Sequence, residues 1–488
     1  MPFLYFTLGL ISVVTQSVLI RLAQVYLFHT DLGYGIFLSF WLFFSGLGCF
    51  SPKIYPFYLI PPYLFGVIYN YFFKYLKQAN QAYIYETLGF CFGGLLFGLG
   101  VSRIGSPYQK VTIKHYQSQD QIFTNNRPYY SFPASEDAYV LKYLSLTSFS
   151  KVLLKANPNY AHTLSQISPQ AQIDLLEVDP VLRKIGQKYL PANACFVSQP
   201  DLFPQQAGNY DLVILAQDIP RSLSDNRYYT REFFQTVKNK ILIIFPYRDF
   251  AAPAYYYPIA SILSALPSAK SYLVDNYLLI VNYDLGLQPI TFPVQANPNS
   301  RRQPQAFFLA QIYHLSSLWP KLPIIIKITA LIFPLILLFF LTSKNDLKSI
   351  FGASFVSFAF NTLALYHFQE IYGSLYSQIS LLLALNLFCL SLGVYLSKNF
   401  SRPPFLLFFL ILVSFHPIIT MIIASLTYGF CFGVLNRQPI TSPYAFDSWG
   451  AALGSLIVTT VLLPIWGINY IVLFCLVLTL FLFFRSLN

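Results

Sequence analysis

Apolar and polar positions follow two different patterns along this chain. The first pattern is a nearly uncharged run of about 20 residues, which is the length that a helix needs to cross a bilayer. Such runs occupy 3–28, 33–51, 54–73 and 82–102, and then 323–342, 351–372, 375–397, 404–436, 444–463 and 466–484. We expect His416-Pro417 to divide the run 404–436, because proline removes a backbone donor and kinks a helix. The pattern predicts ten or eleven spans, four before and six or seven after a middle segment.

The second pattern fills the middle segment, residues 106–310. Short apolar runs alternate there with polar stretches of helical length, which is typical of a parallel sheet covered by helices. Strands are predicted at 151–156, 171–179, 194–198, 210–216, 241–247, 269–275 and 277–284, and helices at 160–167, 180–190, 228–239 and 254–266. Residues 109–132, within a β-rich lead-in at 106–145, resemble small hairpins. The chain is therefore predicted to be a polytopic α-helical membrane protein with an inserted soluble α/β domain.

Composition agrees with a location mainly in lipid. The chain is 55% hydrophobic and 10% charged, whereas about 25% of residues are charged in ordinary globular domains. The net charge is +12, and most of the excess basic residues lie at span ends, where they meet lipid headgroups. The basic balance therefore does not indicate nucleic acid. Arg103, Lys110 and Lys114 follow the fourth span and place the middle domain in the cytoplasm, at a bacterial inner membrane.

Cysteine and histidine give no metal or disulfide pattern. Cys195 is the single cysteine of the middle segment, and the other five lie within spans. The six histidines show no pair at metal-ligand spacing. We expect no metal site.

The membrane portion contains an internal repeat. Residues 11–53 align without a gap with 356–398, and residues 83–94 align with 444–455. The chain is therefore divided into an N-terminal bundle (1–105), the middle domain (106–310) and a C-terminal bundle that repeats the first (311–488).

Within the second pair of segments, Glu86 aligns with Asp447, and each acid precedes a G-x-x-x-G pair. Glycines at this spacing let another helix approach closely. The carboxylates are open to two interpretations. Each can cap the positive end of its helix, or it can line an ion or substrate path, because an ionisable group inside a span is costly and often functional. Arg21 is a candidate partner for either role, or it can extend to the membrane surface.

Three segments of the chain resemble a known family. They are similar to segments of the spermidine synthase family of polyamine aminopropyltransferases, and they occur in the order of strands and helices that this family has. The three segments are EVDP (177–180), YDLVIL (210–215) and NRYYTREFF (226–234). The helical segments, such as YAFDSWGAALG, are similar to those of its membrane-fused members. The resemblance covers nearly the whole chain, and NRYYTREFF is its most specific part. It implies a Rossmann-like domain of the S-adenosylmethionine-dependent transferase type, with decarboxylated S-adenosylmethionine as the cofactor.

The resemblance also implies where a cofactor would bind. A glycine-rich turn after the first strand lets the backbone approach the cofactor, but residues 155–159 read KANPN. Glycine is needed where φ is positive or where a side chain would strike the ligand, so this turn argues against ordinary cofactor binding. Glu177, at the end of the second strand, corresponds to the acid that holds the ribose hydroxyls. Asp201 is the nearest carboxylate to the expected adenine contact.

The catalytic residue that the resemblance implies is also missing from its expected position. In the family, an aspartate at the end of the fourth strand takes a proton from the amine that attacks the carbon beside the sulfonium. Ala216 stands at that position, and Asp218 is the nearby replacement.

The amine site that the resemblance implies is also incomplete. Glu136, Asp137 and Tyr139 would grip the amine, but the histidine expected after them is absent. Tyr210 is a further predicted substrate contact.

The motif NRYYTREFF has a structural interpretation. Thr230 and Glu232 would cap a helix, and Phe233 and Phe234 would form its buried face. This role needs no turnover.

Three functions remain open. The first is a membrane protein whose soluble domain keeps the fold, has lost ordinary catalysis and binds or scaffolds, with a membrane protein or a second copy as partner. The second is a working aminopropyltransferase with a relocated site built from Glu177, Asp218 and the acids near Tyr139. The third is a membrane carrier with Glu86, Asp447, Arg21 and Glu370 in its path and a regulatory middle domain.

Overall fold

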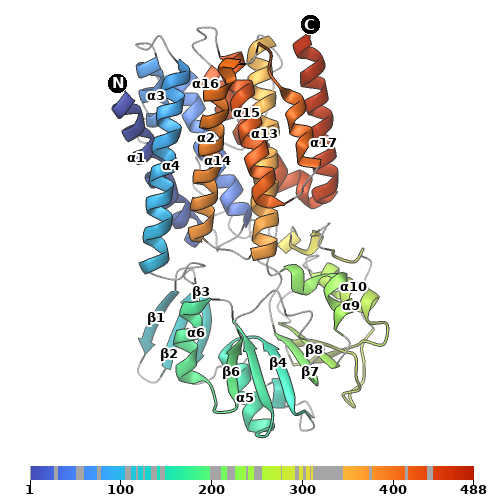
Figure 1. Cartoon of the computed structure of the whole chain (residues 1–488). Helices are drawn as coiled ribbons and strands as arrows, with labels where there is room; N and C mark the ends of the chain where they lie inside the picture. The colour runs from blue at the N-terminus through green and yellow to red at the C-terminus, as the bar shows by residue number, and fades with distance from the viewer. Residues whose placement is uncertain are drawn as a thin grey trace. The chain divides into compact units, whose positions relative to one another are not determined.

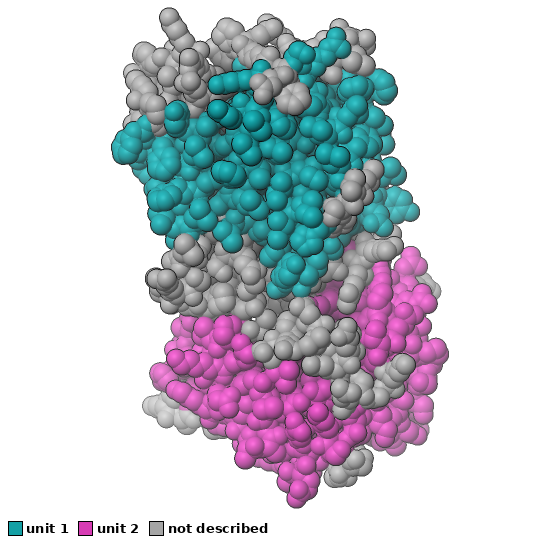
Figure 2. Space-filling view, viewed as in Figure 1, with its two compact units in different colours: residues 1–24, 31–103, 318–488 teal, residues 25–30, 104–317 magenta. Residues whose placement is uncertain are grey.

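The fold is described from a computed structural model of the chain. The structure describes residues 2–26, 31–50, 60–73, 79–104, 111–116, 119–124, 127–132, 140–142, 149–177, 179–197, 210–216, 226–237, 240–246, 255–275, 277–291, 296–300, 304–307, 309–310, 345–372, 376–399, 401–412, 416–436 and 443–487. The chain separates into a helical unit (1–24, 31–103 and 318–488) and an α/β unit (25–30 and 104–317), shown in two colours in Figure 2.

The helical unit holds long apolar helices on both sides of the α/β unit in sequence (Figure 1). They are α1 Pro2–Tyr26, α2 Asp31–Phe50, α3 Pro61–Phe73, α4 Ala79–Ile104, α13 Asn345–Tyr372, α14 Tyr376–Leu396, α15 Pro417–Leu435, α16 Pro443–Ile457 and α17 Leu463–Leu487. Each lies in a run predicted to span a membrane. The predicted run 323–342 lies outside the described residues.

Three segments of the described helices are long and apolar enough to cross a membrane: Leu347–Gln369, Pro417–Leu435 and Gly467–Phe484. Four shorter apolar segments lie in α1, α2, α4 and α14. The predicted break in the run 404–436 is confirmed, because a 3-10 helix covers Phe405–Leu412 and α15 begins separately at Pro417, with His416 in an extended conformation. Gly467 interrupts α17 with a φ of 73°, a backbone conformation that favours glycine.

The internal repeat is visible in how the helices pack. Gly89 of α4 lies against the backbone of Phe6 in α1, and Gly450 of α16 lies against the backbone of Phe351 in α13. The residue shift that relates Phe6 to Phe351 is the shift that aligns 11–53 with 356–398. The second glycine of each G-x-x-x-G pair makes the equivalent contact, four residues further along both helices. The predicted close packing at these glycines is therefore confirmed.

The structure extends the repeat to a helix that the sequence alignment did not include. Gly48 of α2 meets α3 at Gly66, and Gly393 of α14 meets α15 at Gly429. Gly48 and Gly393 are aligned positions, so α3 is the counterpart of α15. Each repeat thus comprises four helices, α1 to α4 and α13 to α16.

The two repeats point in the same direction, as three contacts show. First, α16 runs parallel to α13, because successive glycines of α16 meet successive turns of α13. Second, Asn361 of α13 donates to Asn386 of α14 across a connection of only 373–375, so these two helices run antiparallel.

The third contact joins the repeats to each other. Thr87 of α4 hydrogen-bonds Ser391 of α14, and Cys91 of α4 donates to the carbonyl of Ala384, 2.9 Å away, so α4 also runs antiparallel to α14. It follows that α4 and α16 are parallel. Repeats of this kind are related by an axis along the helices, unlike inverted repeats.

The α/β unit is built on a seven-stranded sheet (Figure 1). Its strands are β4 Lys151–Lys155, β5 Gln172–Leu176, β6 Ala194–Val197, β7 Leu212–Ala216, β8 Lys240–Pro246, β9 Lys270–Val274 and β10 Tyr277–Val281. They lie in the order β6-β5-β4-β7-β8-β10-β9. Six of the strands run in one direction, and β10 runs in the opposite direction. The chain order reverses beside β4, so this is a doubly wound, Rossmann-like sheet. All seven strands agree with the sequence prediction.

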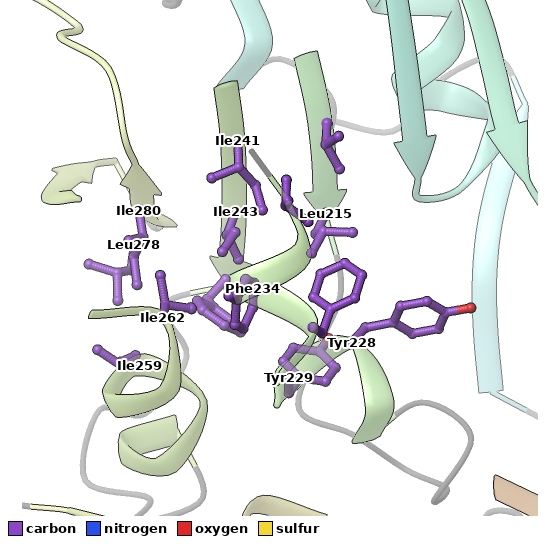
Figure 3. Close-up of a cluster of buried hydrophobic side chains, with 14 of the residues drawn as sticks. Leu215, Tyr228, Tyr229, Phe234, Ile241, Ile243, Ile259, Ile262, Leu278 and Ile280 are labelled. Carbon is purple, nitrogen blue, oxygen red and sulfur yellow. The ribbon is translucent and has the colours of Figure 1, made fainter. Parts of the chain in front are cut away.

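Helices cover both faces of this sheet. On one face, α5 (Pro158–Ile167) packs on the apolar side chains of β4 and β5, and on the other face α9 (Arg231–Thr236) and α10 (Tyr256–Ala265) pack on β7 and β8. Figure 3 shows the second core, to which α9 contributes Phe234, α10 contributes Ile262, and the strands contribute Leu215, Ile241 and Ile243. Both cores are closed by alternate residues of β10, as period-two strands require.

A separate three-stranded antiparallel sheet precedes the large one. It consists of β1 Val111–Tyr116, β2 Gln119–Thr124 and β3 Arg127–Phe132 and matches the predicted hairpins. Ile122 from β2 packs on Leu182 of α6 (Pro180–Gly186), with Tyr129 and Tyr189 at the edge of the contact. The small sheet is thereby fixed close to the carboxyl end of β5.

Candidate functional site

The turn after β4 is built without glycine. Asn157 has extended dihedral angles and caps α5, its side-chain oxygen accepting from the backbone N–H of Asn159 at 3.1 Å, and Pro158 occupies the first turn. Proline at this position is favourable because its missing N–H has no helical partner there. Among the described residues, positive φ values occur only at Asp275, Gly286 and Gly467, none of them in this turn. The KANPN sequence therefore makes an ordinary capped turn rather than a strained one.

The side chains next to this turn include a buried amide and two cations. Asn159 is fully buried, and neither atom of its side-chain amide has a hydrogen-bond partner within the described part of the chain. Lys155, the last residue of β4, has its Nζ atom 5.6 Å from the ring centroid of Tyr228, and the guanidinium carbon of Arg227 lies 5.0 Å from the same centroid. This edge of the sheet thus carries two cations around one buried ring.

Glu177 follows β5, as the sequence predicts, and both of its oxygens are engaged. Oε1 accepts from the backbone N–H of Asp179 at 2.9 Å, and Oε2 accepts from the hydroxyl of Tyr129 at 3.2 Å. Burial raises the pKa of the Glu177 carboxyl above its usual value, and the nearby charge of Lys155 opposes this shift. The carboxylate expected to hold a ribose is therefore held by the protein itself.

The rest of the EVDP segment has a local structural role. Asp179 caps α6 by accepting from the N–H groups of Val181, at 2.9 Å, and Leu182, at 3.4 Å, and Pro180 opens the helix. This arrangement confirms the predicted helix start and needs no ligand.

The motif NRYYTREFF builds the core of the unit, as predicted. Thr230 caps α9 by accepting from the N–H of Phe233 at 3.3 Å, Glu232 lies in the first turn, and Phe233 and Phe234 are buried. The helix begins only at Arg231, because Arg227–Tyr229 form a 3-10 turn and Thr230 is extended. The predicted helix over 228–239 is therefore shorter in the structure.

A buried asparagine that the sequence analysis missed ties this motif to a distant segment. Asn299 is fully buried, donates from Nδ2 to Oδ1 of Asn226 at 2.9 Å and to the carbonyl of Tyr229 at 3.1 Å, and accepts from the N–H of Ala306. Its own N–H donates to the hydroxyl of Ser261 in α10. Asn226 and Asn299 are far apart in the sequence, so no local pattern predicts their contact.

Tyr210 lies at the opposite edge of the sheet from Glu177. It lies two residues before β7, and its hydroxyl donates to Oδ2 of the buried Asp174 at 2.7 Å. The thiol of Cys195 donates to Oδ1 of the same carboxylate at 3.0 Å. Burial and the hydrogen bond to Asp174 raise the pKa of Tyr210. The structure does not bring Tyr210 together with Glu177, because one residue precedes its strand and the other follows.

The remaining predicted site residues of the middle domain lie outside the described residues. They are Asp218, Asp201, Glu136, Asp137 and Tyr139. Ala216 ends β7, at the place where the family has its catalytic aspartate. Within the described part of the chain, no group of three or more histidine, cysteine, aspartate or glutamate side chains could hold a metal ion.

The two acids of the helical repeats are both buried. Glu86 is 2% exposed and Asp447 is 6% exposed, and the charge of Asp447 acts on Glu86. The side chains of Arg21 and Glu370, the other predicted members of this group, lie outside the described side chains.

Comparisons with known proteins add little to this picture. No family model matches the chain, and no curated protein matches it. Among solved structures, it is similar to a probable spermidine synthase from Corynebacterium glutamicum, with 11% identity, a TM-score of 0.30, and 36% of this chain and 77% of that chain covered. It is also similar to the fibrillarin pre-rRNA processing protein of Methanococcus jannaschii, with 10% identity, a TM-score of 0.23, and coverage of 36% and 97%. At these TM-scores, the likeness carries no argument about activity, and the Rossmann-like fold rests on the strand order itself.

Proposed function

We propose that this chain is an integral membrane protein, similar to spermidine synthases, whose Rossmann-like domain has lost ordinary aminopropyl transfer and serves as a binding or scaffold domain. The observation that carries this proposal is the state of Glu177, whose two oxygens accept from Tyr129 and from the backbone of Asp179. A ribose at these oxygens would compete with the tyrosine hydroxyl and the backbone N–H for the same carboxylate acceptor sites.

The charge of the same sheet edge supports the proposal. Decarboxylated S-adenosylmethionine and polyamines are cations, so a site for them should be lined by acids. Here Lys155 ends β4, Arg227 lies across the same Tyr228 ring, and Ala216 replaces the catalytic acid. Each cation would repel a positively charged ligand at this edge. The apolar helices support a membrane location, for which we retain the bacterial inner membrane with the α/β unit in the cytoplasm.

The test is ligand binding to the full chain in lipid nanodiscs. We expect no heat of binding when the protein is titrated with decarboxylated S-adenosylmethionine, S-adenosylmethionine or methylthioadenosine. Glu177→Ala is the control for a specific site, and a thermal melt of each sample shows that it is folded. Micromolar binding by the wild type that disappears in Glu177→Ala would overturn the proposal. It would favour a working transferase with a relocated site, which Asp218→Asn would then test.

A further inference from the structure

Two acidic side chains are buried where the helical repeats contact each other, and the charge of one acts on the other. Glu86 in α4 and Asp447 in α16 occupy aligned positions, each three residues before the first glycine of its G-x-x-x-G pair. Their exposed fractions are 2% and 6%. A side-chain hydrogen bond joins Glu86 to Tyr444, which lies one turn before Asp447, so α4 and α16 are in contact at this point.

Asp447 is well supplied with hydrogen-bond donors. Its Oδ1 accepts from the hydroxyl of Tyr428 in α15 at 2.5 Å and from the hydroxyl of Ser354 in α13 at 2.7 Å. The single hydroxyl proton of Ser354 is shared between Oδ1 and the backbone carbonyl of Asp447, which lies 2.8 Å away, whereas Tyr428 donates to the carboxylate alone. Hydroxyl donors to a carboxylate favour its ionised form.

Glu86 has a different environment. Gly9 of α1 lies against its backbone carbonyl, and α16 contributes Tyr444 and the like charge of Asp447. From α14, the hydroxyl of Ser391 is bonded to the neighbouring Thr87. Its Oε2 is buried and has no hydrogen-bond partner among the described residues. Among the lysine, arginine and histidine side chains that the structure describes, none forms an ion pair with it.

These facts decide between the two charge states of the pair. An isolated ionised carboxylate is very costly to bury, and a neighbouring negative charge adds to the cost. When two carboxylates share a site, one of them keeps a proton. Asp447 has the donors that stabilise a negative charge, whereas Glu86 has an orphan oxygen. We propose that Glu86 is a proton-binding site, which holds its proton at neutral pH against the ionised Asp447 of the other repeat.

This proton links the two repeats. When Glu86 is protonated, α4 and α16 can pack around it without repulsion. Loss of the proton would place two negative charges in one buried contact, and the repulsion would push α4 and α16 apart. The contact between repeats would then depend on proton binding at this one side chain.

Infrared difference spectroscopy of the full chain in nanodiscs tests the proposal directly. A protonated carboxylic acid has a carbonyl stretch that is separate from the carboxylate bands and shifts when the sample is exchanged into heavy water. We expect this band in the wild type at neutral pH, its loss in Glu86→Gln and its persistence in Glu232→Gln, a matched change at an exposed glutamate of α9. A wild type without the band, or a band unchanged in Glu86→Gln, would overturn the proposal.

A second variant separates proton binding from a purely structural role. Asp447→Asn removes the neighbouring negative charge, so we expect Glu86 to release its proton at a lower pH. The band should then disappear at a lower pH as the pH is raised. A thermal melt gives a further readout, because Gln resembles the protonated acid and should leave the melting temperature unchanged. If Glu86 were ionised and paired with a bound monovalent cation, Glu86→Gln would lower the melting temperature and the protein would be stabilised by that cation, which would contradict the proposal.

Discussion

The two helical repeats pack in the same way but treat their buried acids differently. Ser354 in the second repeat occupies the position of Gly9 in the first, and Tyr428 occupies the position of Phe65. Both hydroxyls of the second repeat bind Asp447, while the corresponding positions beside Glu86 have none to offer. Backbone packing and the satisfaction of polar side chains are therefore separate properties of this bundle. The glycine contacts maintain the backbone packing. The side chains that differ between the repeats decide whether each buried acid has hydrogen-bond donors.

We expect the largest loss of stability from substitutions at the glycine contacts that the two repeats share. In Gly89→Ala the added methyl group would meet the carbonyl of Phe6, and in Gly450→Ala it would meet that of Phe351. Because backbone cannot move aside as a side chain can, we expect each change to lower the free energy of unfolding by about 3 kcal/mol or more. Unfolding of the full chain in nanodiscs, followed by circular dichroism, measures this loss.

A third glycine supplies the matched control. In Gly352→Ala the methyl group would meet the side chain of Leu482, with the nearest atom 2.8 Å away. That side chain can rotate, so we expect a cost well below that of the other two changes. Equal costs at all three positions would show that the close backbone approach is not what sets the stability of the repeats.

A second comparison concerns the tyrosine hydroxyls that donate to the two acids. The first of these changes is Tyr428→Phe. This change removes a donor from the ionised Asp447, and hydrogen bonds to charged groups contribute about 1.5–3 kcal/mol. We expect a loss in this range, measured by the same unfolding assay. An unchanged stability would mean that Asp447 carries no charge in the folded state.

Tyr444→Phe should have the smallest effect. Tyr444 bonds Glu86, and a hydrogen bond between neutral groups contributes about 0.5–1.5 kcal/mol. If Glu86 is protonated, this change should therefore cost less than Tyr428→Phe in parallel samples. A larger cost for Tyr444→Phe would reverse the assignment of charge within the pair.

The α/β unit shows how far local sequence reaches. Its seven strands were predictable because each is a short apolar run bounded by turn residues. The caps at Asp179 and Thr230 were also predictable, because each precedes its helix directly and suits that position by residue type. Long-range contacts were not. Asn299 meets Asn226, and Tyr129 meets Glu177, only after strands far apart in the chain have packed together.

In the helical unit, the ungapped alignments of 11–53 with 356–398 and of 83–94 with 444–455 predicted a repeat, and the aligned glycines predicted close helix packing. The match between α3 and α15 escaped detection because it depends mainly on Gly66 and Gly429, which are small positions in otherwise dissimilar sequences. The alignment also paired Glu86 with Asp447, but it left open whether each caps its own helix or lines an ion or substrate path.

Sequence alone thus determined the elements, their order and the repeat, because hydrophobic period, proline and glycine act within a few residues. Only the tertiary structure decided which groups surround each charge. The free energy of a buried carboxylate depends on donors and charges from other helices, and no pattern along one helix contains them. Glu177 and Glu86 are both acids withdrawn at least partly from solvent, yet Glu177 receives a hydrogen bond from a neighbouring sheet, whereas Glu86 experiences the charge of the acid at its aligned position.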